Sequence, residues 1–236
     1  MPKVHYTDFY SHILGISLKV EITGQWGLPI LMFPTTKGSF VQNRDFGLND
    51  SVKWFTETGK VKLYNIETID TKSLYTRNLS PYQRIYNYNK YHEFLVKEFI
   101  PYLQRENQTH RIATAGCSFG GYHAADLAFR NPDLISHLFS LSGAFNIRDM
   151  VEGTSSDLVY FHNPNEFMPN EQPWRYQHMN LVLGVGEYDI CLNKNLNMSG
   201  ILRSKGIPHT LDVKRWANHD WPLWNRMFPE YLGWYF

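Results

Sequence analysis

Cysteine is scarce in this sequence, which contains two such residues, Cys117 and Cys191, among 236. Two cysteines make no disulfide framework, and such low usage is typical of proteins kept in a reducing compartment. We therefore expect both thiols to be reduced. Cys117 precedes a serine and is interpreted as a small packed residue rather than as an activated thiol.

The sequence also lacks segments that would direct the chain to a membrane or out of the cell. Residues 1–8 do not follow the order of basic, apolar and small residues that is typical of a secretory signal. No apolar run approaches the roughly 20 residues of a membrane-spanning helix. These absences predict a cytoplasmic protein with no membrane partner.

Charge of one sign and metal-binding motifs are missing as well. The formal net charge is +1, and the basic residues are scattered, so no nucleic-acid partner is expected. The patterns H-E-x-x-H, C-x-x-C and G-x-x-x-x-G-K-[ST] do not occur, and the ten histidines are dispersed along the chain. We therefore predict neither a metal ion nor a cofactor.

The residues that are present predict a single α/β domain spanning residues 1–236. A hydrophobic share of 43% and a charged share of 19% are typical of globular proteins, while an aromatic share of 16% is high enough to line pockets as well as to fill a core. Residues 146–178 are rich in Asn, Pro and aromatic residues and show no clear periodicity. This stretch is a candidate lid or pocket-wall insertion.

Short apolar runs alternate with helical patterns along the chain. This order predicts a mostly parallel central sheet of about eight strands with helices on both faces, a three-layer sandwich. The first two strands are expected to form an antiparallel hairpin, and Pro101 is expected to disturb the longest helix. The predicted strands cover residues 4–9, 16–22, 28–33, 60–69, 111–115, 134–141, 180–186 and 209–216, and the predicted helices cover 81–104, 122–129, 193–205 and 221–232.

A G-x-S-x-G motif at residues 116–120 is the strongest functional signal. It lies between a predicted strand and a predicted helix, which is the context of a nucleophile elbow. In such a turn the serine hydroxyl is exposed, and the flanking glycines avoid clashes where the backbone doubles back. Ser118 is therefore the predicted nucleophile. The alternative is a glycine-rich turn that binds phosphate at a helix N-terminus.

A serine nucleophile needs a base and an acid, which follow it in the order Asp or Glu and then His. His219 lies in the loop after the last predicted strand and is the predicted base, whereas His209 lies at the wrong end of that strand. Glu187 and Asp189 both follow the strand that ends at residue 186. Asp189 is the preferred triad acid because it comes further along the loop, and Glu187 is the alternative acid.

The oxyanion hole of an elbow site combines two backbone NH groups. The first belongs to the residue after the nucleophile, here Phe119. The second comes from the loop after the third strand, which begins Pro34-Thr35-Thr36. Because proline has no NH, Thr35 or Thr36 is the predicted second donor.

Four stretches of the chain resemble the putative-esterase family of α/β-hydrolases, which includes esterase D (S-formylglutathione hydrolase), feruloyl esterases and mycolyltransferases. In that family the matching serine is the nucleophile, the acid follows the glycine of the sixth strand, and the histidine precedes Asp-Trp. The resemblance therefore implies the α/β-hydrolase fold and the triad Ser118, Asp189 and His219. The family's usual His-Gly after the third strand is here Pro34-Thr35. The matching stretches are residues 115–122, 186–189, 205–209 and 219–224.

Together these features predict a serine esterase, a carboxylic ester hydrolase that acts on small acyl esters through a Ser-Asp-His triad and an acyl-enzyme. Its expected partner is a small-molecule ester. Two alternatives remain open: an acyltransferase with the same triad, and a non-catalytic binding protein that keeps the fold. The sequence does not fix the acyl length, the leaving group or whether the chain forms a homo-oligomer.

Overall fold

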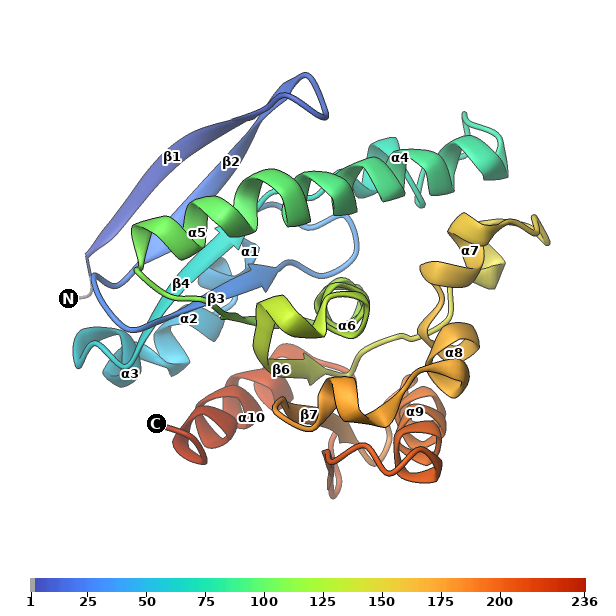
Figure 1. The fold of residues 1–236 in the computed structure, drawn as a ribbon. Helices are drawn as coiled ribbons and strands as arrows, with labels where there is room; N and C mark the ends of the chain where they lie inside the picture. Colours follow the sequence, from blue (N-terminus) through green and yellow to red (C-terminus); the bar gives the residue numbers. More distant parts are fainter. Residues whose placement is uncertain (1–2) are drawn as a thin grey trace.

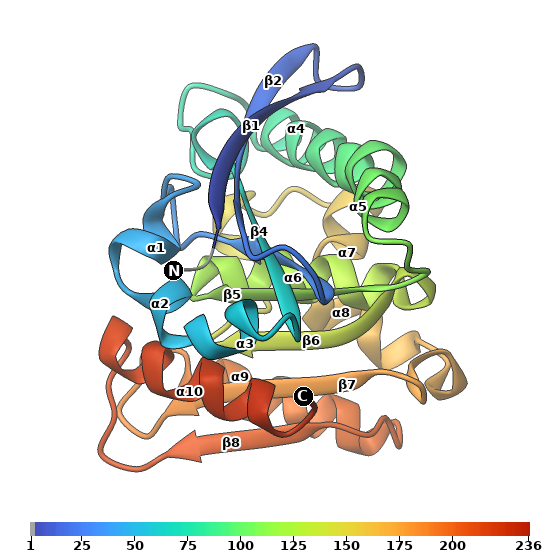
Figure 2. The same cartoon turned by 90° about the vertical axis from the view of Figure 1, so that its left-hand side faces the viewer.

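The computed structural model describes residues 3–236, and an eight-stranded sheet runs through these residues (Figures 1 and 2). Its strand order is β1-β2-β4-β3-β5-β6-β7-β8. The first two strands form an antiparallel hairpin, β2 is antiparallel to β4, and the remaining neighbours are parallel. The strands are β1 (Val4–Ser11), β2 (Ile16–Thr23), β3 (Leu28–Phe33), β4 (Val61–Ile66), β5 (Ile112–Cys117), β6 (Ile135–Leu141), β7 (Asn180–Gly186) and β8 (Thr210–Lys214).

Helices cover both faces of the sheet, so the predicted fold class is confirmed. Figure 2 shows α3 and α10 in front of the sheet, with α6 and α8 behind it. Short 3₁₀ turns lie at η1 (Asp70–Lys72), η3 (Pro132–Leu134), η4 (Arg148–Met150), η5 (Met168–Asn170) and η6 (Pro173–Tyr176). The helices are α1 (Gln42–Asp45), α2 (Leu48–Ser51), α3 (Lys53–Glu57), α4 (Pro81–Phe94), α5 (Ile100–Glu106), α6 (Phe119–Arg130), α7 (Asp157–Phe161), α8 (Pro164–Phe167), α9 (Leu192–Ser204) and α10 (Trp221–Gly233).

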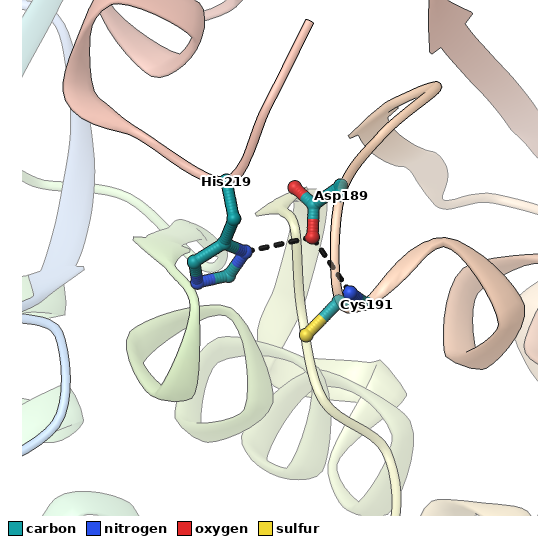
Figure 3. Close-up of side chains that lie close together, drawn as sticks. All are labelled: Asp189, Cys191 and His219. Atoms are coloured by element: carbon teal, nitrogen blue, oxygen red, sulfur yellow. Dashed lines mark hydrogen bonds and ion pairs between the residues drawn. The ribbon is translucent and has the colours of Figure 1, made fainter.

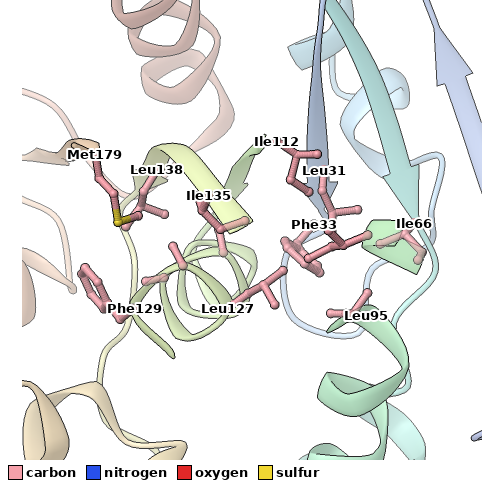
Figure 4. Close-up of a cluster of buried hydrophobic side chains, with 14 of the residues drawn as sticks. Leu31, Phe33, Ile66, Leu95, Ile112, Leu127, Phe129, Ile135, Leu138 and Met179 are labelled. Atoms are coloured by element: carbon pink, nitrogen blue, oxygen red, sulfur yellow. The ribbon is translucent and has the colours of Figure 1, made fainter. Parts of the chain in front are cut away.

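Strand β3 shows why the central strands are almost continuously apolar. Successive side chains of a strand point to opposite faces. Leu31 and Phe33 therefore join the apolar cluster under α4, α6 and α9 (Figure 4), whereas Ile30 and Met32 join the cluster under α2 and α10. Burial on both faces accounts for the apolar pattern.

The long predicted helix begins at Pro81, where Ser80 caps it. The Ser80 hydroxyl accepts from the Gln83 NH, and the Gln83 side chain accepts from the Ser80 NH, a capping box. A π-helical turn, η2 (Leu95–Phe99), separates α4 from α5. Since Pro101 has no NH to continue the α-helical pattern, the disturbance expected at this proline lies in the turn directly before it.

The segment 146–178 contains the short helices α7 and α8 and packs beside the elbow. Val151 and Val159 are buried in one apolar cluster with Phe119 and Tyr122. The Tyr122 hydroxyl also donates to the His162 carbonyl, 2.8 Å away. These contacts hold the segment against α6, next to the serine. Its function as a lid or pocket wall stays a prediction.

Among residues 3–236, no helix has both the length and the apolar character needed to cross a membrane.

His137 on β6 makes the stability of this fold dependent on pH. Its Nε2 lies 2.9 Å from the Asn180 amide nitrogen and accepts a hydrogen bond from it, and burial lowers the pKa of His137 to about 4. The unfolded chain binds a proton on this histidine near pH 6.5, whereas the folded chain does so only near pH 4. The free energy of unfolding therefore decreases as the pH falls from about 6.5 to 4.

Replacing His137 with glutamine is expected to reduce this acid sensitivity. Urea unfolding at pH 7 and pH 4.5 should show that the wild type loses roughly 2 kcal/mol more than the variant, because glutamine does not titrate. Equal losses in the two proteins would show that His137 is protonated alike in the folded and unfolded chains.

Candidate active site

Ser118 lies in the sharp turn between β5 and α6. Its backbone has φ 57° and ψ −119°, a strained conformation for a residue with a side chain. The Ser118 NH donates to the Leu141 carbonyl of β6 at 2.8 Å, which ties the turn to the neighbouring strand. The hydroxyl is thereby held at the carboxyl ends of the parallel strands.

Two glycines of the motif are required by the close approach of backbone segments. A Cβ atom on Gly116 would lie 2.3 Å from the Gly120 carbonyl oxygen, and one on Gly120 would lie 2.4 Å from the Pro34 carbonyl oxygen. Both distances are far below a normal contact. The motif therefore brings α6 against β5 and against the loop after β3.

The structure brings together the three residues that the sequence suggested as a triad. His219, in the loop between β8 and α10, has its Nε2 2.9 Å from the Ser118 hydroxyl and its Nδ1 2.7 Å from Asp189 Oδ1. In the neutral imidazole, Nδ1 faces a carboxylate and so carries the proton, which leaves the Nε2 lone pair to accept from Ser118. This is the tautomer that general-base chemistry requires.

The carboxylate of Asp189 is held by groups that the sequence did not reveal. Its Oδ2 accepts from the buried Ser142 hydroxyl at 2.5 Å, and its Oδ1 accepts from the Cys191 NH at 2.7 Å. The Trp224 indole in turn donates to Ser142 at 2.9 Å. Ser142 directly follows β6 and has φ 54°. The sequence feature that points to Ser142 is its polar side chain directly after the neighbouring strand β6.

These contacts shift both partners toward their charged forms. Burial alone would raise the pKa of Asp189, but hydrogen bonds from His219, Ser142 and the Cys191 NH outweigh it and lower that pKa. Burial alone would lower the pKa of His219, but Asp189 and Cys191 raise it to about 9. The pair therefore stabilises an imidazolium, which is the species formed when the histidine takes a proton from serine.

Glu187 and His209 lie outside this arrangement. The Glu187 carboxylate accepts from the Trp216 NH at 2.9 Å. His209 lies between the Ser199 hydroxyl and the Ile207 carbonyl oxygen. Of the two acids considered from sequence, Asp189 is the one placed against His219.

Among residues 35–38 of the loop after β3, one NH group has no internal acceptor. Thr35 donates its NH to the Gln42 side chain, Lys37 donates to Asp70, and Gly38 donates to the Thr35 carbonyl. Within the part of the chain that the structure describes, the Thr36 NH makes no such bond. Phe119, the first residue of α6, has no intrahelical acceptor for its NH.

A buried carboxylate and a buried imidazole are paired beneath this loop. Asp70 Oδ2 accepts from the Lys37 NH at 3.0 Å, and Oδ1 contacts His123 Nε2 at 2.9 Å. His123 belongs to α6 and stacks on Phe33 at the end of β3. Asp70 therefore links the loop to the helix that follows the serine.

One group of side chains has the composition of a metal site. The ligand atoms of Asp189, Cys191 and His219 all lie within 4.8 Å of one another (Figure 3). Asp189 and His219 also belong to the triad arrangement, so a cation bound here would compete with the hydrogen bond between them.

A family model described as Putative esterase matches residues 65–235. No curated protein sequence matches the chain.

Solved structures of low sequence identity share the fold over nearly the whole chain. A ferulic acid esterase, 15% identical, matches with a TM-score of 0.78 over 99% of this chain and 97% of its own. An S-formylglutathione hydrolase from Staphylococcus aureus, 13% identical, matches with 0.78 over 99% and 96%. A fluorophosphonate-binding serine hydrolase from the same organism, 14% identical, matches with 0.75 over 99% and 98%.

Proposed function

Because the chain belongs to the Putative esterase family and is thus a carboxylesterase-type hydrolase, we propose that it is a serine esterase that cleaves small acyl esters through Ser118, His219 and Asp189. The observation that carries this proposal is the unbroken chain of hydrogen bonds from Ser118 through His219 to Asp189. This chain activates a hydroxyl that is otherwise a weak nucleophile.

The reaction begins with attack of the Ser118 oxygen on the ester carbonyl carbon while His219 Nε2 takes the hydroxyl proton. Asp189 holds the imidazole in its tautomer and stabilises the positive charge. The tetrahedral intermediate then expels the alcohol, which takes the proton from His219. Water, activated by the same nitrogen, releases the acid from the acyl-enzyme.

The negative oxygen of the intermediate requires two preorganised donors. We assign them to the NH groups of Phe119 and Thr36. Thr36 is preferred over Thr35 because the Thr35 NH already donates to Gln42. The loop therefore still offers an oxyanion donor, the Thr36 NH, although it begins with Pro34-Thr35 instead of the family's usual His-Gly.

Hydrolysis of p-nitrophenyl acetate, butyrate and octanoate tests this function directly. We expect release of p-nitrophenol and one equivalent of fluorophosphonate label on Ser118. Adding alcohols as acceptors separates hydrolysis from acyl transfer, since a transferase yields a new ester. Absence of both turnover and labelling would instead favour a binding protein.

Replacing Asp70 with asparagine tests whether the loop after β3 contributes to catalysis. The variant weakens the bond to the Lys37 NH and the pairing with His123, so the oxyanion donor is positioned less well. We expect kcat for p-nitrophenyl acetate to fall roughly 10-fold with a smaller change in KM, because a bond to a charged group is worth about 1.5–3 kcal/mol. Asp50→Asn, at an exposed position of α2, is the matched control. An unchanged kcat would show that the loop keeps its conformation without this carboxylate.

A further inference from the structure

The thiol of Cys191 lies beside the triad, and the proposed reaction does not use this thiol. Cys191 and Asp189 are only 4% and 6% exposed. Figure 3 shows the Cys191 and Asp189 side chains on one loop, with the His219 ring approaching from another. The thiol sulfur lies within 4.8 Å of the His219 ligand nitrogen. A carboxylate, an imidazole and a thiol thus converge from two loops on one buried position.

We propose that Asp189, Cys191 and His219 form an inhibitory site for a borderline-soft divalent cation such as Zn²⁺. Zinc binds thiolate sulfur, imidazole nitrogen and carboxylate oxygen with tetrahedral geometry. The carboxylate and the thiolate balance the two positive charges of the ion, and the fourth position is left for water. The site is distinct from a catalytic cofactor site because occupancy stops the reaction.

Only a small displacement converts the hydrogen-bonded pair into a pair of ligands. His219 Nδ1 and Asp189 Oδ1 are 2.7 Å apart. Two metal bonds of about 2.0–2.1 Å at a tetrahedral angle need a separation of about 3.3 Å. We expect the loop that carries His219 to allow this displacement, because the imidazole is partly exposed. Ser142 continues to hold the other oxygen of Asp189, as an outer partner of a metal ligand does.

The cation blocks catalysis by reversing the protonation of the imidazole. When the metal occupies Nδ1, the single proton of neutral His219 lies on Nε2. Nε2 is then a donor and cannot accept the proton of Ser118. Binding releases the proton of the Cys191 thiol, because the ligand is the thiolate, and it also releases the Nδ1 proton of His219 when the imidazole is charged. Inhibition therefore follows from the loss of the acceptor at Nε2.

Metal binding can be tested without relying on the proposed activity, on which only the inhibitory effect rests. Co²⁺ added to the Ser118→Ala protein is expected to give the near-ultraviolet absorption of a thiolate bound to cobalt, at one equivalent. The same absorption is expected with Cys117→Ala added and is expected to disappear with Cys191→Ser. Its absence from the Ser118→Ala protein, or its persistence without Cys191, would overturn the proposal.

The inhibitory effect is measured as the ratio of esterase rates with and without buffered free Zn²⁺. The wild type should be inhibited and should recover when a chelator is added. For Cys191→Ser the inhibition constant should rise at least about 100-fold, since losing a ligand costs more than losing an outer partner. Equal inhibition of both proteins would disprove a site that includes the thiol. If no esterase activity is found while cobalt binds through Cys191, the proposed function fails and the metal site stands.

Discussion

Replacing Ser118 with alanine is expected to lower kcat for p-nitrophenyl acetate by about 10⁴–10⁶-fold, because the acyl-enzyme can no longer form. The remaining rate would come from the oxyanion donors and from binding alone. The fold should persist, since the hydroxyl contacts His219 at the partly open site rather than filling the core. Rates are measured on purified protein with an equal far-ultraviolet circular dichroism spectrum.

Ser204→Ala is the matched control for this variant. Ser204 is exposed at the end of α9 and donates only to the Ile201 carbonyl. Its removal should leave kcat unchanged. If the Ser118→Ala protein kept more than about a tenth of the wild-type rate, the nucleophile would have to be a different group, and Ser118 would lose its proposed role.

Replacing Asp189 with asparagine is expected to lower kcat by about 10⁴-fold. An amide nitrogen facing Nδ1 favours the imidazole tautomer that carries its proton on Nε2, which cannot accept from serine. The amide also removes the negative charge that stabilises the imidazolium. The loss should therefore fall on kcat, with KM for the ester nearly unchanged.

Glu187→Gln separates the two carboxylates that follow β7. Glutamine can still accept from the Trp216 NH, so this variant should keep kcat within about twofold of the wild type. The opposite ranking, with the larger loss at Glu187, would assign the acid to Glu187 and contradict the proposed triad.

Much of the fold could be predicted because the chain alternates buried strands with helices of clear periodicity. The elbow was predictable for the same reason, since Gly116 and Gly120 flank a serine between a strand and a helix. The choice between Glu187 and Asp189 was harder because both follow the same strand. In the structure the Asp189 NH bonds the Gly186 carbonyl, and its carboxylate accepts from the Cys191 NH, which turns the side chain inward.

The remaining parts of the site depend on contacts between distant residues. Asp70 and His123 are 53 positions apart, so nothing local in the sequence pairs them. Ser142 contacts Asp189 from another strand, and its left-handed backbone is unusual for serine. Such contacts arise from the packing of strand ends, which a single sequence does not specify.

The strand order brings the proposed groups to one edge of the sheet. Strands β3, β5, β6, β7 and β8 are consecutive neighbours, and they are followed in turn by Thr36, Ser118, Ser142, Asp189 and His219. Backbone hydrogen bonds fix the spacing of these strands at about 4.8 Å. The segment 146–178 supplies none of these five residues. Substitutions in that segment could therefore accumulate without moving any of these five positions.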